Sequence, residues 1–234
     1  MEPPAQPSPG PTRPPAPPPP PQLAVTLLVA AAGALETISF LGLDRVFAGV
    51  MTSNLALLGM AIGQQRAVSA TAAALALAGF AGGAAGAAWF TRHSEICEEH
   101  WHPRVVSCLV ATTSVLVAIA AVWAAFDGAP HGITRSLLQF AAAVAMGIES
   151  TAMVAAGHAA APTTYMTGTL ATYIVTSVGS HRRDFWIPAR FGALIVGAAI
   201  SAVLLKSAPE WAAVPPVVLM LCALTAVRSR RSRL

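Results

Sequence analysis

The sequence predicts an all-α fold, a polytopic bundle of transmembrane helices. Of its 234 residues, 55% are hydrophobic and only 10% are charged, whereas a soluble domain carries about 25% charged residues. Two stretches, 67–91 and 105–126, contain no charged residue at all, and each exceeds the ~20 residues that cross a bilayer core. A surface this apolar requires lipid as its solvent, so the lipid bilayer is the first predicted partner.

The chain divides into three parts. Residues 1–22 contain twelve prolines and predict a disordered proline-rich N-terminal tail, because proline suits neither helix nor sheet interiors. Residues 23–227 form a single predicted transmembrane domain. Residues 228–234 are rich in arginine and predict a basic cytoplasmic C-terminal tail.

Eight apolar segments follow the N-terminal tail, at 23–43, 46–63, 69–90, 105–126, 135–157, 162–178, 188–206 and 211–227. The second and sixth are short and contain polar clusters, which favours six full spans plus two short or half-helices; the alternative is eight spans. In both arrangements ten of the 14 basic residues fall on the side of the termini. The positive-inside rule therefore places both termini in the cytoplasm but does not choose between the two span counts.

An internal repeat relates two halves, about 23–126 and 135–227. Each half begins with an apolar segment containing one glutamate, Glu36 or Glu149, and continues to a Met-Thr cluster that starts at Met51 or Met166. Repeats of this kind are common in transporters, where the ligand site lies at the repeat interface. Six spans would make the repeat inverted and eight would make it parallel.

Glu36 and Glu149 are the only carboxylates deep inside apolar segments. An ionised glutamate is costly at the bilayer centre, so intramembrane glutamates indicate a proton or cation site; the alternative is that each is protonated and joins neighbouring helices by hydrogen bonds. With the polar clusters they predict a midplane site for a small solute, a cation or a proton. Its residues are Glu36, Thr52, Asn54, Glu149, Thr164, Tyr165, Thr167 and Thr169.

Other chemistries find little support. The sequence has no nucleophilic triad, phosphate loop or dinucleotide fingerprint, so we expect no catalytic residues, no cofactor and no enzyme. The polar gap 91–104 includes His93, Cys97 and His102, but their spacing matches no strong zinc pattern, so we expect a solvated loop without a metal. The basic residues lie in short gaps and indicate membrane orientation, not nucleic-acid binding.

Two phrases carry a family resemblance, "GALETISFLGLDRVFAGVMTSNLALLG" and "MGIESTAMVAAGHAAAPTTYMTGTL". They resemble the YoaK-like family of bacterial membrane proteins, a domain of unknown function (family 1275), over about 23–227. The resemblance implies the membrane fold and a bacterial inner (plasma) membrane location, and implies no activity.

Together these features predict a small-solute or ion transporter or channel. The alternative is a membrane scaffold or interaction protein, whose contact surfaces would be the proline-rich tail and the gap 91–104. A homo-oligomer and a protein partner for the tail are compatible with either function.

Overall fold

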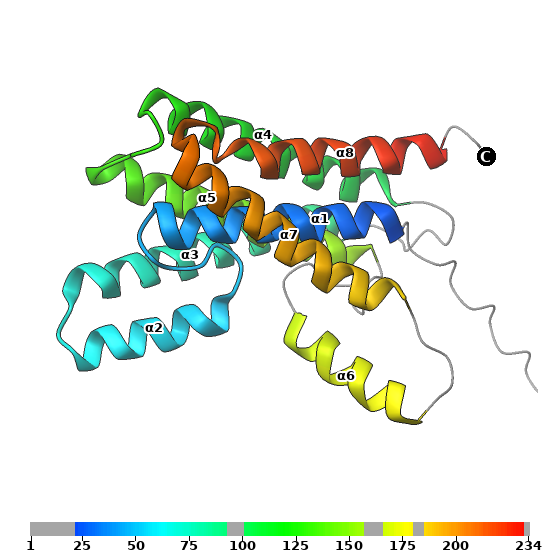
Figure 1. The fold of residues 1–234 in the computed structure, drawn as a ribbon. Coiled ribbons are helices and arrows are strands. Elements are labelled where there is room, and N and C mark those ends of the chain that lie inside the picture. The colour runs from blue at the N-terminus through cyan, green and yellow to red at the C-terminus, as the bar shows by residue number, and fades with distance from the viewer. Residues whose placement is uncertain (1–21, 93–100, 157–165, 180–184, 232–234) are drawn as a thin grey trace, which may run out of the picture.

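The computed structural model describes residues 22–92, 101–156, 166–179 and 185–231, which contain helices and no strands. Six apolar helices are long enough to cross a bilayer (Figure 1). They are α1 (Gln22–Thr37, continued by the π-helical turn η1, Ile38–Gly42), α3 (Ala67–Thr91), α4 (Pro103–Ala125), α5 (Gly132–Ala155), α7 (Trp186–Ser207) and α8 (Val214–Arg231, preceded by the 3-10 turn η2, Pro209–Trp211). The predicted all-α transmembrane bundle is confirmed.

The two remaining helices are too short to cross. Helix α2 (Met51–Gly63) has 13 residues and α6 (Met166–Gly179) has 14, so each reaches about 20 Å, against a bilayer core of about 30 Å. Figure 1 shows both on the same flank of the bundle, α2 beside one end and α6 beside the other. The described residues therefore contain six helices long enough to span and two shorter helices, as the predicted six-span form requires.

Local sequence explains where several elements begin and end. Helix α4 starts at Pro103, which lacks the N–H that a first turn leaves unpaired, and the His102 ring accepts a hydrogen bond from the Arg104 amide at 3.2 Å. Helix α8 continues to Arg231, into the part predicted as the C-terminal tail. The half-helix α2 begins at Met51, later than the predicted start at 46, because the residues before it take a non-helical path.

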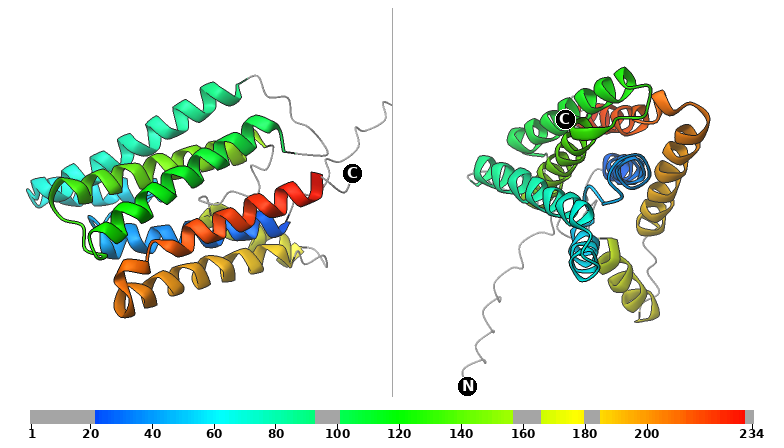
Figure 2. Two further views of the ribbon diagram at one scale, coloured as in Figure 1. Left: turned by 90° about the horizontal axis from the view of Figure 1, so that it is seen from above. Right: turned by 90° about the vertical axis from the view of Figure 1, so that its left-hand side faces the viewer.

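Helix pairing follows the division into halves. The most extensive contacts join α3 to α5 and α1 to α7, followed by α1 to α8 and α4 to α5. The four pairs correspond when α1–α4 are exchanged with α5–α8. The α3–α5 pair then corresponds to α1–α7, and the α1–α8 pair corresponds to α4–α5. Helices α1 and α5 correspond to each other in this exchange. They are also the most buried spans, with 67% and 56% of their apolar stretch buried inside the protein. The end-on view in Figure 2 shows α1 enclosed within the bundle and α2 and α6 outside it.

Four glycines let these paired helices approach closely, because a Cβ at each would overlap a backbone carbonyl of the partner helix. The four contacts are Gly33 with Leu194, Gly197 with Ala30, Gly83 with Val144 and Gly147 with Phe80. Small residues at helix interfaces are the usual means of close packing in membranes. The Gly33–Leu194 contact corresponds to the Gly147–Phe80 contact, and Gly83–Val144 corresponds to Gly197–Ala30. Every pair of corresponding residues is separated by the same number of positions along the chain.

This glycine register differs by one residue from the alignment that matches the two glutamates. It places Gly147 opposite Gly33, so that Ser150 takes the position of Glu36 and Glu149 takes that of Leu35. One residue turns a side chain by about 100° around a helix. Glu36 and Glu149 therefore lie on different faces of their helices relative to the repeat.

Candidate functional site

The site is built around a non-helical segment between η1 and α2. After α1 widens into η1, the amide of Leu43 bonds the carbonyl of Ile38 at 3.1 Å and the chain turns back. The following residues run along the bundle to Met51 without regular structure. Irregular backbone at membrane depth is stable only where protein groups satisfy its N–H and C=O groups, so its side-chain partners are informative.

Asn54 binds this segment from the first turn of α2. Its side chain is fully buried; Oδ1 accepts from the Phe47 amide at 2.9 Å, and Nδ2 donates to the Phe47 carbonyl at 2.7 Å. The Asn54 side chain thus supplies both backbone hydrogen bonds that a paired strand or a helical turn would otherwise give Phe47. The Phe47 ring stacks on Phe40 with centroids 4.8 Å apart.

Glu36 binds the same segment from α1. Its carboxylate oxygens accept the Gly49 amide at 2.7 Å and the Ala48 amide at 2.8 Å. Both amides lie just before the first turn of α2, where backbone N–H groups lack helical partners and favour negative charge. The carboxylate therefore also acts as the anchor of the N-terminal end of α2.

Ser39 and Gln139 add a buried polar link between this segment and α5. The Ser39 hydroxyl lies 2.6 Å from the Val46 carbonyl and 2.8 Å from Gln139 Oε1, and both side chains are fully buried. A hydroxyl has one proton, and Gln139 Nε2 has no partner in this orientation. Turning the Gln139 amide over gives Ser39 a consistent pair of bonds, with Gln139 Nε2 donating to the Ser39 hydroxyl and that hydroxyl donating to the Val46 carbonyl.

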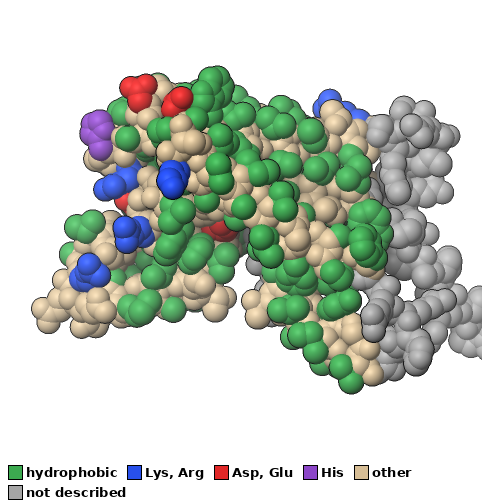
Figure 3. Space-filling model, viewed as in Figure 1, with side chains coloured by type: hydrophobic (Ala, Val, Ile, Leu, Met, Phe, Trp, Pro, Cys, Tyr) green, Lys and Arg blue, Asp and Glu red, His purple; other side chains and the backbone are tan. Residues whose placement is uncertain are grey.

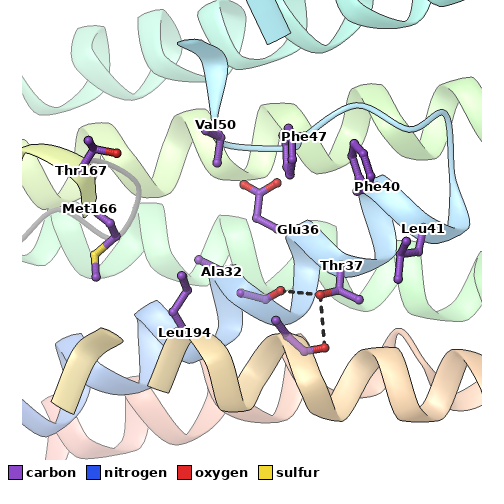
Figure 4. A pocket seen from close by; sticks show the side chains of 12 residues that line it. Ala32, Glu36, Thr37, Phe40, Leu41, Phe47, Val50, Met166, Thr167 and Leu194 are labelled. Atoms are coloured by element: carbon purple, nitrogen blue, oxygen red, sulfur yellow. Dashed lines mark hydrogen bonds between the residues drawn. The ribbon is translucent and has the colours of Figure 1, made fainter. Parts of the chain in front are cut away.

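A cavity of about 440 Å³ lies against this segment (Figure 4). It is bounded by α1 and η1, by the residues before α2, by the first residues of α6 and by α7. Its lining residues are Ala32, Gly33, Glu36, Thr37, Phe40, Leu41, Phe47, Val50, Met166, Thr167, Leu194 and Ala198. The N-terminal ends of both half-helices thus border one cavity.

Among the described residues that line the cavity, only Glu36, Thr37 and Thr167 have polar side chains. The Thr37 hydroxyl is directed to backbone carbonyls, Gly33 at 3.1 Å and Ala198 at 3.2 Å (Figure 4). Figure 4 shows the Glu36 carboxylate between Phe47 and Val50, with Met166 and Thr167 across the cavity. Glu36 is the only ionisable group among the described residues that line it.

Comparison with known proteins gives a family. The model described as "Protein of unknown function (DUF1275)" matches residues 24–226. The chain belongs to this family. It is also 31% identical over 152 residues to the UPF0700 transmembrane protein YoaK of Bacillus subtilis (strain 168), in an alignment covering 64% of each protein. The chain thus covers less than two thirds of that relative, and no solved structure matches it significantly.

The family result confirms the resemblance that the sequence predicts. The six apolar spans and the name of the relative together identify the chain as a multi-pass membrane protein whose helices contact lipid. Neither the family description nor that name states an activity.

The structure places three of the predicted site residues, Glu36, Thr52 and Asn54, at or near the segment before α2, and a fourth, Thr167, across the cavity. Glu36 lines the cavity, and so does Thr167 at the start of α6. Asn54 is buried and holds the segment through Phe47. Thr52 is exposed on the first turn of α2 and does not line the cavity.

The other predicted residues are placed differently. Glu149 is only 1% exposed on α5, and neither it nor Thr169 lines the cavity. Thr164 and Tyr165 lie outside the described residues, as do most of the polar gap 91–104 and the N-terminal tail. Among the described residues no group of three His, Cys, Asp or Glu side chains could hold a metal ion.

Sequence reasoning did not identify Phe40 and Phe47 as site residues. Both are apolar side chains near the end of an apolar segment, and that pattern is typical of core or lipid contact. The available signal was the run from Gly42 to Gly49, which contains two glycines and two charged residues directly after Glu36. Such a run indicates irregular backbone next to an intramembrane carboxylate.

Proposed function

We propose that the protein transports a small solute or ion across the membrane, through a midplane site at the interface of the two halves. One observation carries the proposal: Val50, the N-cap residue of α2, and Met166 and Thr167, the first residues of α6, line the same Glu36-containing cavity, although the two helices lie beside opposite ends of the bundle. Half-helices that meet at mid-membrane form the binding sites of many repeat-built transporters. The proposal includes no catalytic step.

The packing of the halves supports the same proposal. The contacts α3–α5 and α1–α7, which correspond when the two halves are exchanged, fit two repeat-related halves. Three spans in each half would make the repeat inverted, an arrangement in which one set of helices can rock against the other. Glu36 has a structural role besides its proposed role in binding, because the hydrogen bonds that it accepts from the Ala48 and Gly49 amides stabilise the segment before α2. A test must therefore change the cavity without removing those bonds.

Location and orientation belong to the proposal. We propose a bacterial plasma membrane with both termini in the cytoplasm. Counting six spans along the sequence, ten of the 14 basic residues fall on the side of the termini, which supports a cytoplasmic location for that side. Fusing a reporter that is active only in the cytoplasm to the C-terminus tests this, and activity of a periplasm-specific reporter there would reverse the orientation.

The experiment is flux through proteoliposomes of the purified full chain. Osmotic swelling, followed by light scattering, reports entry of small neutral solutes, and trapped dyes report protons and cations. Ala198→Phe fills the cavity from α7 while leaving the bond from Thr37 to the Ala198 carbonyl. The matched control is Ala199→Phe, the same change at the next residue of α7, which is exposed.

We expect at least one solute to enter faster than in protein-free vesicles, with the rate lost in Ala198→Phe and kept in Ala199→Phe. A panel of solutes and ions without flux above empty vesicles would overturn the transport function. That outcome would favour the scaffold, for which no described residue gives specific support because its predicted contact surfaces lie largely outside the described part. Pull-down with and without residues 1–22 would then test it.

A further inference from the structure

The cavity next to Glu36 also indicates which kind of solute it fits. We infer that it binds a small organic cation with an apolar body, the simplest example being an aryl-alkyl ammonium ion. This inference rests on the proposed transport function for its physiological meaning. The binding itself can be measured without flux.

Charge is the first argument. Glu36 faces the cavity, and none of the twelve described lining residues is basic. Its oxygens accept from the amides of Ala48 and Gly49, and the Val50 amide also interacts with the carboxylate. A carboxylate has about four acceptor positions, so these three amides leave acceptor capacity for an ammonium group. An anionic solute would meet this carboxylate with no cation among the described lining residues to offset it.

The aromatic pair is the second argument. Phe40 and Phe47 both line the cavity, and their rings stack within 19° of parallel. The faces of aromatic rings attract cations, and they do so more strongly where water is excluded. In Figure 4 the Phe47 ring lies beside the Glu36 carboxylate, with the Phe40 ring on its far side. An ammonium group near Glu36 would therefore have an aromatic wall as well as an anion.

The oxygen supply argues against a bare metal ion. Hard cations require about six oxygen ligands, and among the described lining residues only Glu36, Thr37 and Thr167 have side-chain oxygens. The Thr37 hydroxyl is already directed to two carbonyls. Sugars and polyols need many polar partners and fit this wall poorly for the same reason. A volume of about 440 Å³ is within the usual range for small organic ligands.

The surroundings of the cavity suit an apolar body. In Figure 3 a notch separates α2 from α6, with apolar side chains along its borders and acidic atoms at its head. Leu41, in the cavity wall, is 62% exposed, and Leu55 on α2 and Leu170 on α6 are 58% and 42% exposed. An amphipathic cation can therefore approach with its apolar part against apolar side chains and its charge toward Glu36.

The test compares three probes of nearly equal size and different charge: phenethylammonium, 2-phenylethanol and phenylacetate. Binding to the purified full chain in a non-ionic detergent is measured by isothermal titration and by thermal stabilisation. We expect the ammonium probe to bind at least about tenfold more tightly than the alcohol. Phenylacetate should bind most weakly.

Three variants make the test specific. Glu36→Gln should abolish the preference for the ammonium probe, and its matched control Glu210→Gln, a partly buried glutamate in η2, should keep it. Phe47→Leu should weaken ammonium binding, while the Asn54 bonds remain because they use the Phe47 backbone. If Glu36→Gln does not fold, Ala198→Phe supplies the decisive comparison, since it blocks the cavity without changing Glu36.

Equal affinity for the three probes, a preference for phenylacetate, or ammonium binding that survives Ala198→Phe would each overturn the inference. The two proposals fail separately. Specific ammonium binding without flux would leave the inference standing and remove transport. Flux of other solutes that Ala198→Phe blocks, without ammonium binding, would do the reverse.

Discussion

Replacing Gly83 by alanine adds a single methyl group, and we expect this group to destabilise the bundle. A Cβ at Gly83 would overlap the Val144 carbonyl on α5, at a distance roughly 1 Å short of an ordinary contact. The obstacle is backbone, so α3 and α5 must separate. Overpacking of this kind costs about 1–3 kcal/mol, and the better helix propensity of alanine returns at most about 1 kcal/mol. We therefore expect a net loss of about 1–2 kcal/mol.

Gly82→Ala is the matched control, because a Cβ at the adjacent position meets nothing within 4 Å. It should leave stability unchanged or raise it slightly. Thermal unfolding in detergent, monitored by circular dichroism, measures the difference between the two variants. Gly197→Ala should reproduce the Gly83 effect at the swap-related contact with Ala30. Equal stability of Gly82→Ala and Gly83→Ala would refute the close approach of α3 and α5.

Two further substitutions separate buried from exposed polar contacts. Asn54→Ala should lower the unfolding free energy by about 1–3 kcal/mol, because it leaves the Phe47 amide and carbonyl without their partner. Asn54→Asp keeps an acceptor for the Phe47 amide and should lose less stability. An unchanged unfolding free energy in both variants would contradict the anchoring role of Asn54. Arg135→Gln should cost less than about 1 kcal/mol, since Arg135 is 45% exposed in its 3.0 Å ion pair with Asp44. A loss of several kcal/mol in the same unfolding assay would show that the pair is far more shielded than its exposure indicates.

The sequence predicted the spans well because a bilayer imposes a simple requirement on them. About 20 consecutive apolar residues suffice to identify a crossing helix, and all six observed spans coincide with predicted segments. The two short segments stayed ambiguous, since apolar composition does not distinguish a short span from a half-helix. Tertiary structure decided that question, because α2 begins only at Met51, after a segment that side chains hold in place.

The candidate site was predictable only in part. Glu36 stood out because a carboxylate in an apolar segment is rare, and the structure places it in the cavity wall. Phe40 and Phe47 carried no such signal, because their role depends on a chain reversal that brings them together. Glu149 aligns with Glu36 in the sequence, yet the glycine contacts set a register that differs by one residue. Close backbone approach, which decides that register, is a three-dimensional property.

The glycine contacts also bear on how the chain is made. Gly33 on α1 packs against Leu194 on α7, and Gly83 on α3 packs against Val144 on α5. Each close pair therefore joins a helix from the first half to a helix from the second. During synthesis α1 enters the bilayer long before its partner exists, and its small-residue face must wait in lipid or against another protein. The halves are consequently interlocked, and neither would be expected to reach its final packing when expressed alone.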